Sequence, residues 1–238
     1  MILRSTIAAA ALLPWAVCAQ SGKPTTATSP TATSTTSAER PKLPPSALPL
    51  QFAGGERVAL VGGSFGDALG RSGELETLLH SRFPKLELII RNFCRPADEV
   101  GLRQRPSNYT SLDDPLKVFT PDTYLCFFGY NESFAGPAGV EKFKADYEKF
   151  LDDYAKQYSR PGASPAPRFV LISPSAVEAS GDANFPDAKA RNANLALYTK
   201  AIQEVAKKRG LAAVDILGKT ADLFAKKRAS SSPLMAPS

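Results

Sequence analysis

Residues 57–66 have the sequence RVALVGGSFG, which predicts a buried β-strand that ends in a glycine-rich turn. A continuous apolar run closed by glycine is typical of a strand that is covered on both faces in a parallel sheet. Apolar residues then recur at helical spacing from Asp67 to Phe83, and Pro84 follows. The stretch therefore predicts a strand, a tight turn and a helix, which is the first half of a βαβ unit.

The same alternation continues along the chain, although a long polar stretch from 95 to 121 interrupts it. Further strands are predicted at residues 86–90, 124–129, 169–172 and 212–216, and further helices at 140–158, 188–209 and 219–227. The continuous apolarity of 124–129 predicts a central strand. We therefore expect an α/β domain, with a parallel five-stranded sheet and helices on both of its faces. Ligands of such sheets bind beyond the carboxyl ends of the strands.

Other segments differ in composition from this domain. Residues 1–19 combine a charged start, a short apolar run and a small-residue cleavage site, which predicts a signal peptide and an exported protein, periplasmic or extracellular. The apolar run is too short to span a bilayer. Cys18 leaves a lipoprotein as an alternative. Residues 20–51 are rich in Thr, Ser and Pro and predict a disordered linker, 52–228 the folded domain, and 229–238 a disordered tail.

Charge and cysteine content narrow the class of function. The formal charge of +6 is spread along the chain without a basic patch interleaved with aromatic residues, which argues against a nucleic-acid partner. The glycine-rich turn lacks the G-x-G-x-x-G spacing and the P-loop lysine, so no nucleotide cofactor is expected. Cys94 and Cys126 either pair or stay free and buried, and their spacing predicts no metal site.

Two residues at predicted strand ends can carry chemistry. Ser64 follows the first strand, at a helix N-terminus where backbone N–H groups favour negative charge. Asn131 follows the third strand and can direct its side-chain amide toward the same space, as an oxyanion donor does. An ordinary helix cap is the alternative for each of them.

The order of the motifs resembles that of the SGNH, or GDSL-type, hydrolases. Residues 62–65 resemble their G-D-S-L block, 91–98 their second block and 129–132 their G-x-N-D block. Residues 78–84 and 98–100 resemble a subgroup that is frequent in environmental bacteria such as planctomycetes. The resemblance covers about 55–217, and it implies the three-layer, flavodoxin-like SGNH hydrolase fold.

The resemblance also implies roles for single residues. Ser64 matches the nucleophile, Asn131 matches the side-chain oxyanion donor, and Ala97 stands where the family has a glycine that donates its backbone N–H. Gly63 and Glu132 each stand where the family has an aspartate, so the sequence does not determine which hydrogen bonds support the site. The implied substrate is a small ester or an acylated carbohydrate, and no cofactor is implied.

The fourth family block, an Asp and a His three residues apart near the C-terminus, is not found after Asp215. The one histidine, His80, lies in the first predicted helix, ~20 Å along its axis from Ser64 at ~1.5 Å per residue. We therefore predict an exported SGNH-type serine ester hydrolase with weak or no turnover. The alternative is a non-catalytic protein. It is either the remnant that a truncated gene encodes or a module that binds a glycan or an ester. Nucleotide binding has only the glycine-rich turn in its favour.

Overall fold

The computed structural model describes residues 42–103, 113–158, 166–180, 182, 184–185 and 187–228. The predicted signal peptide, the predicted tail and the first part of the predicted linker lie outside these residues. None of the helices within the described ranges is long and apolar enough to cross a membrane.

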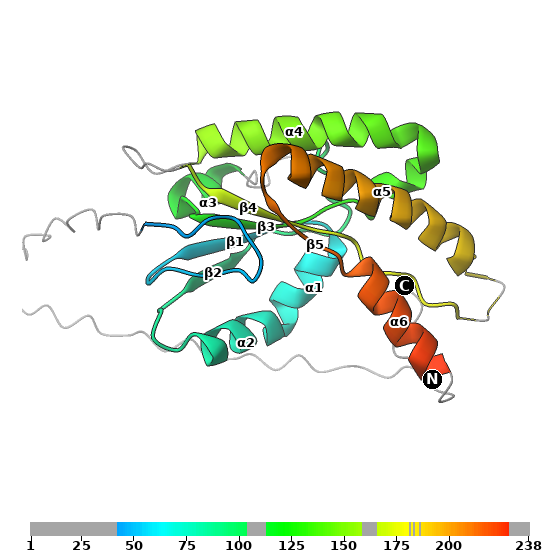
Figure 1. The fold of residues 1–238 in the computed structure, drawn as a ribbon, viewed down its shortest axis with the longest axis horizontal. Helices are drawn as coiled ribbons and strands as arrows, with labels where there is room; N and C mark the ends of the chain where they lie inside the picture. Colours follow the sequence, from blue (N-terminus) through cyan, green and yellow to red (C-terminus); the bar gives the residue numbers. More distant parts are fainter. Residues whose placement is uncertain are drawn as a thin grey trace, which may run out of the picture. The chain divides into compact units, whose positions relative to one another are not determined.

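The described residues form a parallel sheet of five strands in the order β2-β1-β3-β4-β5 (Figure 1). The strands are β1 (Arg57–Gly62), β2 (Ile89–Asn92), β3 (Thr123–Phe127), β4 (Arg168–Ile172) and β5 (Ala212–Val214). All four pairings between neighbours are parallel. The predicted fold class and the central position of the third strand are thus confirmed. Gly62 lies opposite Phe127, so the carboxyl ends of β1 and β3 are adjacent.

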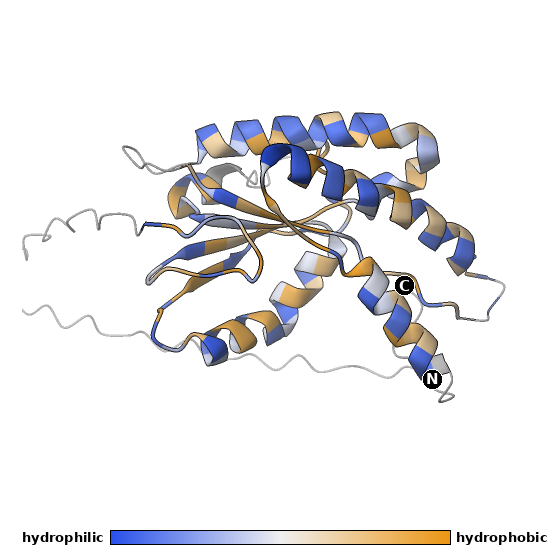
Figure 2. Ribbon diagram, in the orientation of Figure 1, coloured by the Kyte–Doolittle hydropathy of each residue, from blue (hydrophilic) through white to orange (hydrophobic). Residues whose placement is uncertain are grey.

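Helices cover both faces of the sheet, as predicted (Figure 1). The helices are α1 (Ser64–Ser72), α2 (Glu74–Arg82), α3 (Asp113–Phe119), η1 (Glu132–Gly139), α4 (Val140–Gln157), α5 (Ala188–Arg209) and α6 (Leu217–Arg228). Helices α4 and α5 lie on one side and α1 and α2 on the other (Figure 1). Figure 2 shows α4 striped with hydrophobic and hydrophilic residues, as expected of a helix with one face on a sheet.

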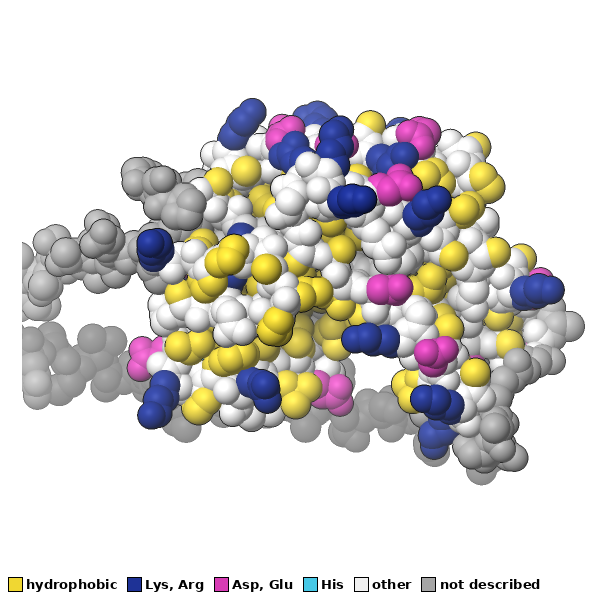
Figure 3. All heavy atoms as spheres, in the orientation of Figure 1, with side chains coloured by type: hydrophobic (Ala, Val, Ile, Leu, Met, Phe, Trp, Pro, Cys, Tyr) yellow, Lys and Arg dark blue, Asp and Glu magenta, His cyan; other side chains and the backbone are white. Residues whose placement is uncertain are grey.

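The core on the α4 side is rich in aromatic residues. Phe143, Tyr147, Phe150 and Tyr154 lie along α4, and each is buried against the sheet. This spacing of three and four residues is the apolar face that the sequence predicts for the helix. On the visible surface, acidic and basic side chains are interspersed rather than separated by sign (Figure 3).

The structure corrects the prediction of one helix from 67 to 83. The chain instead forms α1 and α2, which meet at Gly73, whose φ of 70° is left-handed and ends the first helix. The strand predicted at 86–90 lies at Ile89–Asn92, because Glu87 has a φ of 48° and interrupts extended backbone. The polar stretch from 95 to 121 contains α3.

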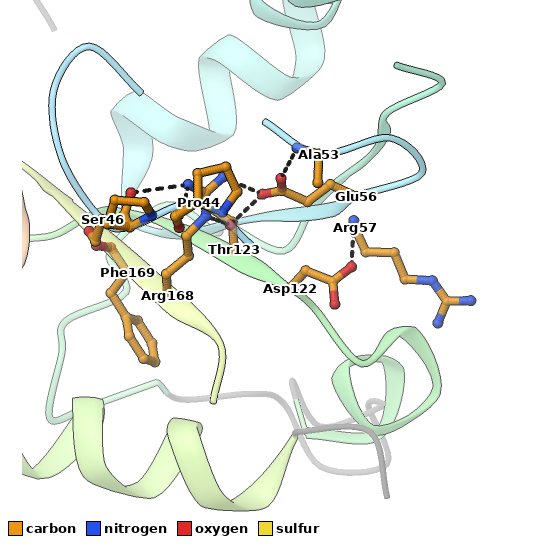
Figure 4. A network of polar contacts seen from close by, with 10 residues as sticks. Pro44, Ser46, Ala53, Glu56, Arg57, Asp122, Thr123, Arg168 and Phe169 are labelled. Atoms are coloured by element: carbon orange, nitrogen blue, oxygen red, sulfur yellow. Dashed lines mark hydrogen bonds and ion pairs between the residues drawn. The ribbon is translucent and has the colours of Figure 1, made fainter. Parts of the chain in front are cut away.

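Residues 42–51 belong to the predicted linker, and they form hydrogen bonds with the folded domain. The Ser46 hydroxyl donates to the Phe169 carbonyl at 2.5 Å and accepts from the Ala212 backbone N–H at 3.1 Å. The Arg168 guanidinium donates to the Pro44 carbonyl at 3.2 Å (Figure 4). These contacts lie at the amino ends of the strands, since Arg168 is the first residue of β4.

Candidate active site

The turn between β1 and α1 brings Ser64 to the carboxyl edge of the sheet. Gly62 has a φ of 132°, and a Cβ there would lie 2.2 Å from the Phe127 carbonyl oxygen, so only glycine fits. The Gly63 N–H donates to the same carbonyl at 2.9 Å. Gly63 is the N-cap residue of α1, and Ser64 is its first helical residue. The structure thus contradicts the alternative that Ser64 is a helix cap.

The Ser64 side chain is open to solvent and forms no hydrogen bond with the described residues. The residue is exposed, and its hydroxyl has no hydrogen-bond partner within the part of the chain that the structure describes. The first N–H groups of a helix have no intrahelical acceptor, so α1 presents donors at the same point. An exposed hydroxyl beside free N–H groups is an arrangement that can bind a carbonyl group.

The loop after β2 contributes Ala97, whose φ of 64° lies in the left-handed region. Alanine therefore adopts a backbone conformation that favours glycine, and the loop is strained there. Ala97 is exposed, and its N–H has no acceptor among the described residues. Next to it, Asp98 is buried, and the Asp98 carbonyl oxygen points toward the turn after β1.

The loop after β3 contributes Asn131. Asn131 occupies the N-cap position of η1, as the helix-cap alternative predicts, but its side chain makes no capping hydrogen bond there; its Nδ2 instead donates to the Asp98 carbonyl at 3.5 Å. A Cβ on Gly63 would lie 3.2 Å from the Asp98 carbonyl oxygen and 3.7 Å from Asn131 Nδ2. Three loops therefore converge at Gly63, immediately before Ser64. The structure brings together the neighbourhoods of all three residues that the sequence selects.

Glu132 joins two of these loops. One carboxylate oxygen accepts the Val100 N–H and the other accepts the Gly129 N–H, each at 2.8 Å. The hydrogen-bond support that the sequence left open is therefore present. Desolvation raises the pKa of this carboxyl group to about 7, and the negative charge of Glu99 adds to the rise, while the backbone hydrogen bonds oppose it.

Arg191, from α5, is a functional candidate that sequence reasoning missed. It is 7% exposed, and its guanidinium donates to the Tyr130 carbonyl at 2.8 Å. The guanidinium carbon lies 3.4 Å from the centroid of the Phe134 ring and 4.9 Å from that of the Tyr130 ring. It forms no ion pair with any carboxylate of the described residues. The arginine has no motif around it that could have revealed this position.

His80 lies away from this edge. It is in α2, with Nε2 3.8 Å from a carboxylate oxygen of Glu76, and its side chain is 43% exposed. Helix α2 leads back toward the start of β2, at the amino edge of the sheet (Figure 1). His80 is the one histidine of the sequence, so no histidine of this chain lies beside Ser64.

The remaining candidates are structural. Cys94 and Cys126 are both free and buried, which contradicts the disulfide alternative, and burial raises the pKa of each thiol. Asp215 accepts the Gly218 N–H at 3.1 Å and so caps the start of α6. Within the described ranges, no cluster of His, Cys, Asp and Glu could hold a metal ion.

Comparisons with known proteins find no matching family model and no matching curated sequence. Solved structures do match. A protein named GDSL-like lipase, from Parabacteroides merdae, aligns at 17% identity over 82% of this chain and 92% of its own, with a TM-score of 0.56. A catalytic mutant of an acetylxylan esterase from Geobacillus stearothermophilus aligns at 15% identity over 74% and 83%, with a TM-score of 0.51.

A carbohydrate acetylesterase family member from Sinorhizobium meliloti aligns at 12% identity, over 67% of this chain and 82% of its own, with a TM-score of 0.52. All three structures share the parallel sheet with helices on both faces at low sequence identity. A likeness of this kind concerns the fold and leaves the chemistry to the residues of each site. The chain has the SGNH hydrolase fold.

Proposed function

We propose that this chain is an SGNH-type protein that binds esters at Ser64 and cleaves them slowly or not at all. The observation that supports the proposal is the convergence at Gly63, where the Asp98 carbonyl and the Asn131 amide flank the residue before Ser64. In this proposal the Ala97 N–H and the Asn131 amide are the oxyanion donors.

The chemistry follows from the positions of these groups. The Ser64 hydroxyl oxygen attacks the ester carbonyl carbon and loses its proton to solvent water, while the carbonyl double bond opens and places negative charge on the carbonyl oxygen. The two donors and the N-terminus of α1 stabilise that charge, and one such donor typically contributes ~3 kcal/mol. When that double bond reforms, the bond to the alcohol oxygen breaks, the alcohol leaves with a proton from water, and a second water molecule then hydrolyses the acyl-Ser64 ester. Because the Ala97 donor is a backbone N–H, alanine supplies it as well as glycine does.

In this proposal the site has no histidine that acts as its base. In a serine hydrolase a histidine removes the hydroxyl proton as the bond to carbon forms. The only histidine of the sequence, His80, lies in α2, with Nε2 3.8 Å from a Glu76 carboxylate oxygen. Members of a triad act as a unit, so the loss of the base lowers turnover by orders of magnitude. In this proposal the site is therefore better suited to bind an ester than to hydrolyse it.

The proposed substrate class is a small ester, in particular an acylated carbohydrate. The names of the similar structures, acetylxylan esterase and carbohydrate acetylesterase, support this choice. Export to the periplasm or the extracellular space, where such polymers occur, belongs to the same proposal and rests on residues 1–19.

A non-catalytic ester- or glycan-binding module is the second candidate. The position of His80 favours it, since a site without a base retains its donors and loses its turnover. The two candidates share the same residues and differ only in whether Ser64 forms a bond to the substrate.

Hydrolysis of p-nitrophenyl acetate separates them. We expect a slow rate above background for the unchanged protein, and loss of that rate in Ser64→Ala. Asn131→Ala lowers the rate about 100-fold or to background, because one oxyanion donor is removed. Ser72→Ala, at the exposed other end of α1, is the matched control and keeps the rate. Equal rates for Ser64→Ala and the unchanged protein would overturn the hydrolase and leave the binding module.

A further inference from the structure

An exposed aromatic residue, Phe134, lies one turn after Asn131, a proposed oxyanion donor. Phe134 is 65% exposed, and its N–H donates to the Asn131 carbonyl at 3.0 Å. The two residues are therefore one turn of a 3-10 helix apart, ~6 Å along the axis. Exposure of a large aromatic side chain so close to a candidate site is a feature of binding surfaces.

The ring is held in place from one side. The Arg191 guanidinium carbon lies 3.4 Å from the Phe134 centroid, and Arg191 is itself buried and bound to the Tyr130 carbonyl. The Tyr130 ring meets Phe134 edge-on, with centroids 6.0 Å apart and planes at 82°. One face of the Phe134 ring is therefore covered by a cation, while most of the residue stays exposed to solvent.

The other exposed apolar side chains lack this setting. Val118 on α3 is 84% exposed and Leu78 on α2 is 67% exposed, and neither is aromatic or follows a strand end at the carboxyl edge. Among the described aromatic residues, only Phe185 is also exposed, at 36%. Among the described aromatic residues, Phe134 thus combines high exposure, a contact with Arg191 on one face and a position one turn after Asn131.

We propose that Phe134 is a stacking platform for the sugar ring of an acylated carbohydrate whose ester group lies at Ser64. This inference rests on the proposed function and specifies its substrate. The C–H face of a pyranose carries partial positive charge, and an aromatic face is negative, so the two attract. The hydroxyl groups at the rim of the sugar remain in water, which suits a single open platform.

An apolar acyl chain fits this surface less well. Apolar ligands are held in clefts that cover most of their area, whereas Phe134 offers one flat face. A sugar ring is apolar on its faces and polar at its rim. It can therefore stack on an open aromatic ring while its hydroxyl groups keep their hydrogen bonds to water. The fixed position of Phe134 also lowers the entropy lost when the sugar binds.

Calorimetric binding of acetylated xylotriose tests the platform. The measurement is made in the Ser64→Ala background, so that no ester is cleaved during the titration. We expect Phe134→Ala to weaken binding about five- to tenfold, and Phe134→Leu, which keeps an apolar side chain without the ring, to weaken it similarly. Phe134→Trp restores binding. Val118→Ala is the matched exposed control and has no effect. Thermal melts establish that each variant is folded.

The outcomes distinguish this inference from the proposed function. Equal affinity in Phe134→Ala and its parent overturns the platform, as does the absence of any xylotriose binding. If Phe134→Ala weakens binding of p-nitrophenyl butyrate but not of the sugar, the ring contacts the acyl group and the sugar assignment is wrong. Sugar binding that depends on Phe134, without hydrolysis that depends on Ser64, overturns the hydrolase and supports the platform.

Discussion

Charged side chains at the two edges of the sheet differ in the partners that they bind. At the amino edge, Glu56 and Arg168 are 0% and 6% exposed in their side chains and form an ion pair at 2.7 Å. The Thr123 hydroxyl and the Ala53 N–H also donate to the Glu56 carboxylate (Figure 4). Both charges are therefore paired and hydrogen-bonded.

At the carboxyl edge, Asp67 pairs with Arg71 at 2.9 Å, whereas Glu132 and Arg191 are held without an ion pair to any described residue. Glu132 accepts two backbone N–H groups, and Arg191 donates to a backbone carbonyl and lies against aromatic rings. Neither forms an ion pair with another described residue. A charge withdrawn from water with no opposite charge beside it is unfavourable for folding, and such groups are frequent at functional sites.

The buried ion pair stabilises the fold at the amino edge, whereas the proposed function places the ligand at the carboxyl edge. A paired buried charge depends on its partner for stability, because removal of one member leaves the other uncompensated. An unpaired carboxylate instead responds to pH. Variants at the two edges are therefore expected to fail in different ways.

The largest expected effect is at the amino edge. Glu56→Gln keeps the shape of the side chain and removes its charge, which leaves the Arg168 guanidinium buried and unpaired. We expect the free energy of unfolding to fall by about 3–5 kcal/mol, measured by urea denaturation with the slope of the transition unchanged.

The control for this prediction is an exposed ion pair of the same type. Asp153→Asn breaks the pair with Lys149 on α4, in which both side chains are largely exposed. It is expected to cost under about 1 kcal/mol, since solvent screens such pairs. Similar losses for Glu56→Gln and Asp153→Asn would show that the buried pair does not hold the amino edge.

A smaller and pH-dependent effect is expected at the carboxyl edge. The pKa of Glu132 is raised to about 7 in the folded protein, above its ordinary value of 4.5. The folded state therefore binds this proton more tightly than the unfolded state, and stability falls as pH rises between these two values. Because the side chain is only partly buried, we expect a loss of about 2 kcal/mol between pH 5 and pH 8.

Glu132→Gln removes the titrating group and flattens this part of the pH profile. At pH 5 the variant is less stable than the parent, because an amide N–H₂ group faces one of the two backbone N–H groups. Glu141→Gln, at an exposed carboxylate of α4, is the control and retains the slope. A slope that persists in Glu132→Gln would assign the pH dependence to another group.

Much of the fold could be predicted from the sequence because its signals are local. Continuous apolar runs identify parallel strands, and the predicted bounds of 188–209 are those of α5. The predicted helix from 67 to 83 was wrong because apolar spacing continues across Gly73, and a left-handed glycine gives the same sequence signal as a helical one. Backbone conformation at a single residue is not encoded in periodicity.

The site could be predicted only where the chain supplies short motifs. Ser64 and Asn131 follow strand ends and lie in recognisable blocks, so their convergence at one edge follows from a parallel sheet. Arg191 reaches Tyr130 across 61 positions of sequence, from a helix without any motif. Such a contact depends on how α5 is rotated against η1, which tertiary packing determines and local sequence does not.

The smallest expected effect has the opposite sign and lies at Ala97. Ala97→Gly relieves the left-handed backbone at φ 64°, so we expect it to raise the free energy of unfolding by about 0.5–1 kcal/mol. Ala68→Gly, at an exposed position within α1, is the matched control and lowers stability by about the same amount. Urea denaturation measures both. Since glycine retains the backbone N–H, ester binding at Ser64 is unchanged. A loss of stability in Ala97→Gly would show that the loop is not left-handed in solution, and the proposed donor would then lose its position.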